Sequence, residues 1–551
     1  MKARTFVLEK LGALLASRGL ELPAKTTVET PKSGQHGDMA TNIALVLPRE
    51  KGQNPRAVAE EIRTGLAAMC PEVERIEIAG PGFINFTFTP AFWQSVALEA
   101  LAQGPDFGRV DVGKGRRVQV EYVSANPTGP LHIGHGRGAA VGDSLTRILR
   151  FTGHEVETEY YLNDAGRQMR LLGLAVWVRY QQACGLDIPF PEDCYRGEYI
   201  KDISAALLAE RGRTLLDLPE DEALDLCYER GMRDILGGIQ EDLRNFRVEH
   251  QHWFSEKSLV DGGQVTATLN RLLDQGRAYE KDGALWFRST DYGDDKDRVL
   301  RKSDGLLTYF ASDIAYHDNK IARGFDMMVD IWGADHHGYV PRMKAAMEAL
   351  GKDRESLQVI LVQLVNLIQG GEQIAMSTRA GKFETLADVC AEVGVDAARF
   401  IFLSRKSDAH LDFDLDAVKQ QSMENPVYYV QYAHARICSL MRKAREQGVS
   451  LPAPGMGLMA LLNTPEDKAL CTCLDAFADT VELATRTLSP HHVSYYLQEL
   501  AGLLHRYYTV HHILSGENQD LLLARILLFS AVAGVLRTGL DLLGVAAPER
   551  M

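Results

Sequence analysis

The fold is indicated most clearly by the residues Val120-Glu121-Tyr122-Val123-Ser124-Ala125-Asn126-Pro127-Thr128-Gly129-Pro130-Leu131-His132-Ile133-Gly134-His135. The β-branched residues of 117–123 predict a strand, and the Asn-Pro and Gly-Pro pairs that follow predict a loop. A helix is expected from about His132 to Phe151, and a further strand over 155–161. This strand–loop–helix–strand order is half of a doubly wound, Rossmann-type nucleotide fold.

The segment His132-Ile133-Gly134-His135 lies where the predicted helix starts. Helix N-termini carry unpaired N–H groups and a partial positive charge, so they bind phosphates. His132 and His135 share one helix face and could both donate to phosphate oxygens, while Gly134 leaves the backbone open to a flat base. Taken alone, two histidines at this spacing are more often a helix cap and a surface residue. A zinc site is less favoured still, because no third ligand stands at a recognisable spacing.

The 551 residues are too many for one core and suit several domains. Working outward from the loop, we expect three units: residues 1–108 as a small α+β domain, 109–395 as the α/β domain with a parallel sheet, and 396–551 as an almost purely helical bundle. The segment 169–247 is helical by pattern and predicts an insertion into the α/β domain. The α/β pattern resumes with strands expected at 284–287, 327–332 and 359–365.

The bulk composition is that of an ordinary globular chain, with 46% hydrophobic and 24% charged residues. We expect no apolar run of membrane-spanning length and no signal peptide, hence a cytoplasmic protein without a membrane partner. Eight scattered cysteines favour reduced core thiols over a disulfide or metal site. The net charge of −14 argues against nucleic-acid binding unless a local basic patch provides it, for which the segment 436–445 is a candidate.

The longer string that begins at Val120 resembles the HIGH motif of class I aminoacyl-tRNA synthetases in the extended form of the arginyl enzymes, and the resemblance runs through nearly the whole chain. It implies activation of L-arginine with ATP and Mg²⁺, followed by transfer to tRNA(Arg) by an enzyme that works as a monomer. His132 and His135 would be catalytic. The residues implied in ATP binding are Leu131, His132, Gly134, His135, His336, Met376 and Ser377.

A selective arginine site needs carboxylates, because guanidinium is a planar cation with five donors. Tyr309 and Asp313 stand one turn apart on a predicted helix, which by spacing alone is more often a surface tyrosine with a first-turn acid. From the sequence pattern alone, Glu121 could equally be a charge on an edge strand, and Asn126 a turn residue before proline. The family resemblance implies instead that arginine is bound by Glu121, Ser124, Asn126, His135, Glu256, Tyr309, Asp313 and His336.

The second class I motif, KMSKS, is degenerate in this sequence. Met376-Ser377-Thr378-Arg379-Ala380-Gly381-Lys382 stands in its place, with Ala375 where the first lysine belongs. Arg379 and Lys382 are the local candidates for the catalytic cation that faces the pyrophosphate, and Lys114, Arg116 and Arg117 upstream of the first motif are alternatives.

The helical C-terminal part resembles the anticodon-binding bundle of the same family, which implies tRNA contacts by Tyr429, Tyr432 and Arg436. Aromatic and basic side chains suit unstacked bases, although tyrosines at helical spacing are equally often core residues. Three alternatives remain at this point. They are a class I synthetase for another amino acid, a small adenylyltransferase with the same motif, and a catalytically inactive tRNA-binding paralogue.

Overall fold

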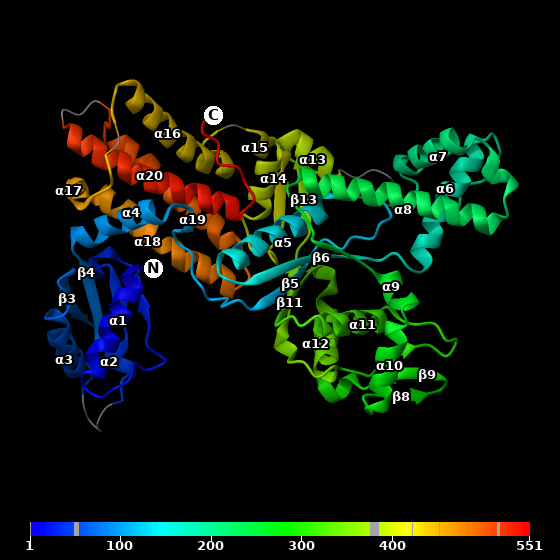
Figure 1. The fold of residues 1–551 in the computed structure, drawn as a ribbon, viewed down its shortest axis with the longest axis horizontal. Coiled ribbons are helices and arrows are strands. Elements are labelled where there is room, and N and C mark those ends of the chain that lie inside the picture. The colour runs from blue at the N-terminus through cyan, green and yellow to red at the C-terminus, as the bar shows by residue number, and fades with distance from the viewer. Residues whose placement is uncertain (1, 49–53, 375–384, 421, 451, 515–517) are drawn as a thin grey trace.

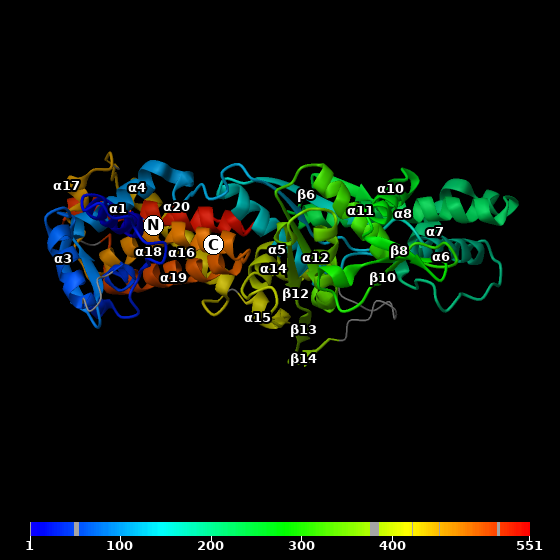
Figure 2. The ribbon, with the colours of Figure 1, turned by 90° about the horizontal axis from the view of Figure 1, so that it is seen from below.

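The computed structural model describes residues 2–48, 54–374, 385–420, 422–450, 452–514 and 518–551. The molecule is elongated (Figure 1). A small N-terminal unit and the C-terminal helices lie at one end, the parallel sheet lies near the middle, and a helical arm projects from the other end. The view turned by 90° shows the same order along the long axis (Figure 2). The parallel sheet therefore lies between the two ends of the molecule.

The N-terminal unit is a four-stranded antiparallel sheet with the order β1-β2-β4-β3. Strands β3 and β4 flank Gly80-Pro81-Gly82, with Gly80 and Gly82 at positive φ in the turn between them. Phe88 stacks on Phe92, which joins the sheet to the next helix. The elements are α1 (Lys2–Ala16), β1 (Val28–Glu29), β2 (Met39–Thr41), α2 (Ile43–Val46), α3 (Pro55–Ala67), β3 (Val73–Ala79), β4 (Phe83–Phe88) and α4 (Pro90–Gln103).

The central sheet is parallel throughout and has the order β12-β11-β5-β6-β7. The chain runs outward from β5 to β6 and β7 on one side, then returns to place β11 and β12 on the other. The carboxyl ends of β5 and β11 therefore form a topological switch point, where doubly wound folds bind their ligands. The strands are β5 (Arg117–Glu121), β6 (Glu155–Leu162), β7 (His252–Ser255), β11 (Met327–Gly333) and β12 (Leu357–Val362), and α5 (Ile133–Phe151) follows β5.

The expected helical insertion is present between β6 and β7 and forms the projecting arm (Figure 1). Its helices are α6 (Arg167–Ala183), α7 (Glu198–Arg211) and α8 (Glu220–Asn245). The remaining elements of this half include α9 (Glu256–Asp261), α10 (Gln264–Asp274), α11 (Tyr309–Ala322), α12 (Val340–Ala349), α13 (Leu386–Val393) and α14 (Val395–Phe402).

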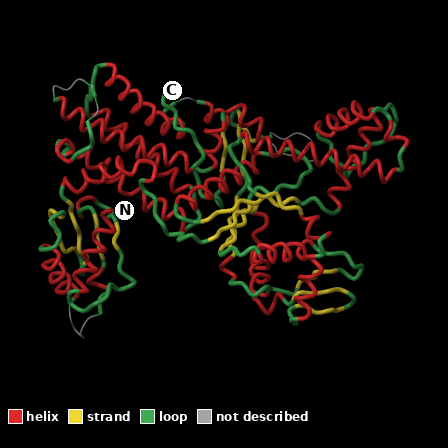
Figure 3. The backbone as a smooth tube through the Cα atoms, viewed as in Figure 1, coloured by secondary structure: helices red, strands yellow, loops and turns green. Residues whose placement is uncertain are grey.

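Two local expectations are wrong. The strand at 284–287, β9 (Ala284–Phe287), does not join the parallel sheet but pairs antiparallel with β8 (Ala278–Lys281) and β10 (Arg298–Arg301). Asp282 and Gly283 both have positive φ, as a tight hairpin requires. The second exception lies in the region expected to be helical, where β15 (Leu411–Asp414) runs parallel to β13 (Val365–Gln369). The separate groups of strands are visible in Figure 3.

The C-terminal part is a bundle of long helices against which α4 also packs. Its members are α16 (Pro426–Glu446), α17 (Met456–Met459), α18 (Pro465–Arg486), α19 (His491–Val510) and α20 (Gln519–Leu542). By length and composition α20 could cross a membrane, which corrects the expectation that no segment qualifies. It packs against α4, α16 and α19, and 56% of its most apolar window is buried in this bundle.

Helix α5 lies directly against the residue that follows β5, because Gly142 has no side chain there. A Cβ on Gly142 would overlap the ring of Tyr122, which is fully buried. We expect Gly142→Ala to destabilise the fold by about 1–3 kcal/mol through overpacking, measured as the free energy of unfolding in urea. Gly138→Ala on the same helix is the matched control, since a Cβ there meets nothing within 4 Å. Equal stability of the two variants would contradict this packing argument.

Candidate active site

The start of α5 is built by the two predicted histidines. His132 is the N-cap residue, and its Nδ1 accepts a hydrogen bond from the backbone N–H of Gly134 at 3.1 Å. The backbone N–H of His132 in turn donates to Nδ1 of His135 at 3.2 Å. The two rings stack with their centroids 3.6 Å apart. A Cβ on Gly134 would lie 3.0 Å from the His132 ring, so glycine is also what allows this stack.

These hydrogen bonds determine where the imidazole protons are. In both rings Nδ1 accepts from a backbone N–H, so each neutral ring carries its proton on Nε2. Burial lowers the pKa of His132, and burial together with His132 lowers the pKa of His135 to about 3. Both side chains are therefore neutral donors at physiological pH. They can bind a phosphate oxygen through Nε2–H without exchanging a proton with it.

The tautomer is open to direct measurement. We expect the ¹⁵N shifts of both histidines to report neutral Nε2–H rings that persist as the pH falls below 6. Because their folded pKa values are depressed, protonation favours the unfolded chain. Their contribution to stability is complete above the unfolded pKa of about 6.5 and is lost as the pH falls toward the folded value. A ring that titrates near pH 6.5, or one protonated on Nδ1, would refute this arrangement.

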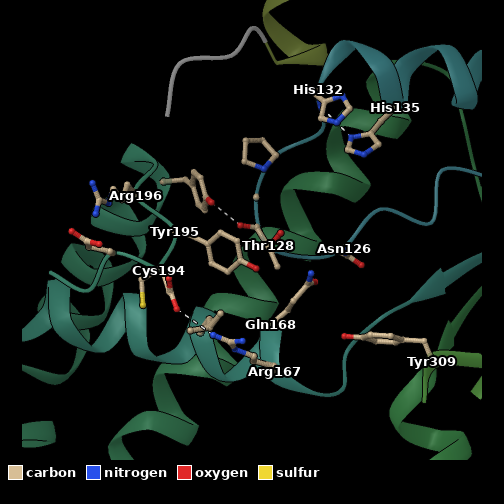
Figure 4. A pocket seen from close by; sticks show the side chains of 16 residues that line it. Asn126, Thr128, His132, His135, Arg167, Gln168, Cys194, Tyr195, Arg196 and Tyr309 are labelled. Atoms are coloured by element: carbon tan, nitrogen blue, oxygen red, sulfur yellow. Dashed lines mark hydrogen bonds and ion pairs between the residues drawn. The ribbon is translucent and has the colours of Figure 1, made fainter. Parts of the chain in front are cut away.

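A cavity of about 980 Å³ opens beside the start of α5 (Figure 4). One wall is the β5–α5 loop, from Asn126 to Pro130, and continues into His132 and His135. The opposite wall comes from the insertion and includes Gln168, Tyr195 and Tyr199. The Tyr199 hydroxyl donates to the backbone carbonyl of Thr128 at 2.6 Å, which attaches the insertion to the loop. Tyr309 enters from a third direction, at the N-terminus of α11.

The predicted arginine-site acids lie next to this cavity, in a partly buried acidic region. Asp313 stands one turn after the exposed Tyr309 on α11 and accepts a hydrogen bond from the Tyr339 hydroxyl. Glu256 is buried at the first turn of α9 and interacts electrostatically with Asp313. Burial raises the pKa of Asp313, opposed by the Tyr339 hydrogen bond, and burial also raises that of Glu256. Two carboxylates that are costly to ionise alone would be stabilised by a cation placed between them.

Glu121 and Ser124 lie behind the loop rather than on the cavity surface. The Ser124 hydroxyl donates to Oε1 of Glu121 at 3.1 Å, and the other carboxylate oxygen accepts from Nζ of Lys320 at 2.6 Å. Each carboxylate oxygen of Glu121 therefore has one partner inside the protein. Of the eight residues implied in arginine binding, Asn126, His135 and Tyr309 line the cavity.

Other predicted residues are placed as follows. His336 lies in the short helix after β11, with 60% of its side chain exposed, and is not among the described residues that line the cavity. The second-motif residues Met376, Ser377, Arg379 and Lys382 lie outside the described residues. The nearest described residue after them, Thr385, forms a bridge with His132, and Leu386 N–H donates to the Leu131 carbonyl at 2.8 Å.

The predicted tRNA contacts share α16. Tyr429 and Tyr432 are partly exposed, and both pack on the ring of His505. The Arg436 guanidinium lies over the Tyr508 ring, 4.1 Å from its centroid. These contacts hold the side chains at the surface of the bundle. His434 between them is buried instead, with a ring nitrogen 2.9 Å from the Pro548 carbonyl, so it belongs to the fold.

Two groups of residues near the site were missed from the sequence. The insertion wall was treated only as helical, although Tyr195-Arg196 is an aromatic–basic pair of the kind that often lines ligand sites. Lys320 was missed because a lysine on an amphipathic helix normally faces solvent. The available signal was Asp330, an acid within the apolar strand 327–332, because a buried carboxylate requires a cation.

The chain is a class I aminoacyl-tRNA synthetase, because the family model for the catalytic domain of that class covers the parallel sheet and the helix start with the paired Nε2–H donors. Three family models cover the chain in order: "Arginyl tRNA synthetase N terminal domain" over 7–88, "tRNA synthetases class I (R), catalytic domain" over 97–439 and "DALR anticodon binding domain" over 430–551. The chain belongs to the arginyl-tRNA synthetase family and is an arginine–tRNA ligase.

Individual relatives agree with this assignment. The chain is 59% identical to the arginine–tRNA ligase of Nitratidesulfovibrio vulgaris strain DP4, over 100% of both chains. It is similar to a solved arginyl-tRNA synthetase structure from Campylobacter jejuni, with a TM-score of 0.77, 37% identity and coverage of 84% of this chain and 100% of the other. The arginyl-tRNA synthetase of Thermus thermophilus shares the fold at 23% identity, with a TM-score of 0.75 over 100% of both chains. Family membership sets aside a synthetase for another amino acid and a small adenylyltransferase, and the full-length identity to arginine–tRNA ligases sets aside an inactive paralogue.

Proposed function

We propose that ATP and L-arginine meet in the cavity at the carboxyl end of β5, and that the residues implied by the sequence act there. The observation that carries this proposal is the stacked pair His132 and His135, whose Nε2–H groups are fixed by backbone hydrogen bonds beside the cavity. Leu131, Gly134 and the second-motif residues Met376 and Ser377 would complete the ATP site, with His336 at its edge.

In the first step a carboxylate oxygen of arginine attacks the α-phosphorus of ATP. The bond from that phosphorus to the bridging oxygen breaks, and pyrophosphate leaves with the electron pair. Charge grows on the phosphate oxygens, and fixed neutral donors stabilise it without reorganisation. We assign this role to His132 and His135. The cation facing the pyrophosphate would come from Arg379 or Lys382.

The arginine substrate would lie with its guanidinium at the acidic region and its α-amino and carboxylate groups at the β5–α5 loop. Asp313 and Glu256 would bind the guanidinium with Tyr309 against its plane. Asn126 would bind the α-amino and carboxylate end, with Ser124 and Glu121 holding the turn behind it. In the second step the 2′-hydroxyl of the terminal adenosine of tRNA(Arg) attacks the arginyl carbonyl. AMP leaves, and the hydroxyl proton passes to its phosphate.

Mg²⁺ would enter with ATP rather than occupy a site of its own. No group of three or more His, Cys, Asp or Glu in the described part of the chain is arranged to hold a metal ion. An ion held mainly by substrate phosphates needs no such cage. When bound, it would neutralise charge on the leaving pyrophosphate.

We also propose that Tyr429, Tyr432 and Arg436 contact single-stranded bases of tRNA(Arg). The enzyme would work as a monomer in the cytoplasm, without a membrane partner. In domain terms, residues 1–108 and 396–551 would contact tRNA, and 109–395 would carry out catalysis.

The test is arginine-dependent exchange of pyrophosphate into ATP, with and without tRNA(Arg) and with Mg²⁺ varied. Exchange that requires arginine and Mg²⁺ is the expected result. Exchange supported by another amino acid, or none with tRNA present, would overturn the proposed site chemistry.

A further inference from the structure

Three carboxylates lie side by side beneath the arginine site, one on each of three neighbouring strands. Asp330 of β11 is the register partner of Glu121 of β5, and Glu121 is the register partner of Glu159 of β6. All three are at least 93% buried. A row of ionised acids in the interior is costly unless cations neutralise it.

Helix α11 supplies those cations. Nζ of Lys320 donates to Oε2 of Glu121 at 2.6 Å and to Oδ1 of Asp330 at 2.8 Å, and the side chain is 0% exposed. Arg323 binds Glu159 through Nη2 at 2.8 Å, and the Tyr316 hydroxyl donates to the same carboxylate at 2.6 Å. Burial opposes the charge on Lys320, but Asp330 and Glu121 together raise its pKa above the usual range.

The carboxylate of Glu121, which Lys320 holds in place, also contacts the loop that follows β5. Val123 and Ser124 both have positive φ, at 70° and 40°, which is a strained conformation for residues other than glycine and especially for a β-branched one. The turn is held by Ser124, whose hydroxyl donates to Glu121 and accepts from the Tyr161 N–H at 3.1 Å. Two residues later the chain reaches Asn126 on the cavity wall.

The same helix carries the other end of the arginine site. Asp313 precedes Lys320 by seven residues, which is two turns or about 10 Å along the axis. Lys320 therefore connects two parts of the proposed arginine site. One is Asp313 on α11, which would bind the guanidinium, and the other is the strained turn that leads to Asn126, which would bind the α-amino end. The connection runs through Lys320, Glu121 and Ser124, with direct hydrogen bonds at each step.

We propose that Lys320 is a positioning residue that sets the distance between the two ends of the arginine site, and thereby selects the length of the amino acid side chain. This inference rests on the proposed placement of arginine between Asp313 and Asn126. A lysine that served only to neutralise the buried acids would influence stability but not the preference among guanidino amino acids of different length.

The experiment compares L-arginine with two analogues of different length, L-homoarginine and 2-amino-4-guanidinobutyrate, in pyrophosphate exchange with tRNA(Arg) present. In Lys320→Met we expect the ratio of kcat/KM for arginine over homoarginine to fall by about tenfold, the effect of losing discrimination of one methylene. KM for ATP should stay within about twofold. An unchanged ratio in folded Lys320→Met would overturn the proposal.

Two further variants keep the test decisive. Arg399→Met is the matched control, because Arg399 is also 0% exposed and pairs with Asp143 on α5, outside the arginine site. It should lower Tm without changing the ratio, and a change as large as in Lys320→Met would contradict the inference. If Lys320→Met does not fold, Ser124→Ala removes the same linkage without removing a charge and should shift the ratio in the same direction.

Asp313→Asn separates this inference from the proposal on which it rests. If that variant uses arginine as well as the wild type does, the placement of arginine is wrong. If it is impaired while Lys320→Met and Ser124→Ala keep the wild-type ratio, only the role of Lys320 fails.

Discussion

Asp313→Asn is expected to lower kcat/KM for L-arginine by about a hundred- to a thousandfold, with KM for ATP changed by less than about twofold. The substitution keeps the size of the side chain but removes the charge that, in the proposed placement of arginine, binds the guanidinium. Removing one partner of a buried, hydrogen-bonded charge pair costs about 2–5 kcal/mol, and the expected hundred- to thousandfold loss lies in the middle of the range of rates to which this cost corresponds. Asp313 is partly buried, and Tyr339 donates to one of its carboxylate oxygens, which leaves acceptor capacity for a guanidinium.

The pH dependence gives a second measurement on the same variant. Burial raises the pKa of Asp313 and of Glu256 in the free enzyme, so both take up protons at a higher pH than ordinary carboxyls. Arginine binding needs them ionised, and KM for arginine should therefore rise as the pH falls through these raised values. Asp313→Asn should show a weaker rise, because only Glu256 still titrates.

Asp318→Asn is the matched control for this prediction. Asp318 lies on the same helix, accepts a hydrogen bond from the Thr268 hydroxyl at 2.9 Å and pairs with Arg271, away from the cavity. Its kinetics should stay near those of the wild type. Equal losses for arginine and ATP in Asp313→Asn, or equal losses in the two variants, would count against guanidinium binding by Asp313.

The parts of the fold that could be predicted from sequence are those set by local chemistry. Strand β5, its Pro- and Gly-containing loop and helix α5 each carry their own signals, and the observed helix starts one residue after the expected His132. Strand β9, expected at 284–287, was assigned to the wrong sheet because its pairing with β8 depends on a turn. The Asp282-Gly283 pair was the overlooked indication of that turn. Strand β15 is only four residues long, too short for its alternation to stand out between helices.

The same distinction between local and long-range determinants applies to the residues of the site. His132 and His135 are close in sequence, and their spacing predicts that they share one helix face, as the stacked rings show. Their joint role in catalysis was implied only by the family resemblance and stays a prediction. Asp330 within an apolar strand indicates that a buried cation is needed. That this cation is Lys320 could not be predicted, because its burial depends on three strands that place Glu121, Glu159 and Asp330 in register. Glu121 was assigned to substrate binding from resemblance. In the structure each of its oxygens accepts one internal hydrogen bond, from Ser124 and from Lys320, and its contact with arginine stays a prediction.

His135→Asn is expected to lower kcat by about a hundred- to a thousandfold with KM for ATP changed only severalfold. The Asn side-chain oxygen can replace Nδ1 as the acceptor for the His132 N–H, so the start of α5 is kept, but no donor remains at the position of Nε2. Loss of one fixed donor to a developing oxyanion has an effect of this size. Because the ground state binds ATP through several other groups, the loss should fall on the chemical step.

His135→Gln tests the same assignment with the reverse change, since it keeps a donor and removes the acceptor. Its amide nitrogen reaches toward the position of Nε2, while the acceptor for the His132 N–H is lost. This variant should keep more of kcat than His135→Asn but have the lower Tm. Single-turnover formation of arginyl-adenylate, followed together with thermal unfolding, distinguishes the two effects. If His135→Asn retained the wild-type rate, or if both variants lost activity only in proportion to their stability, His135 would serve the helix start alone. Phosphate stabilisation would then have to come from His132 and the cation opposite it.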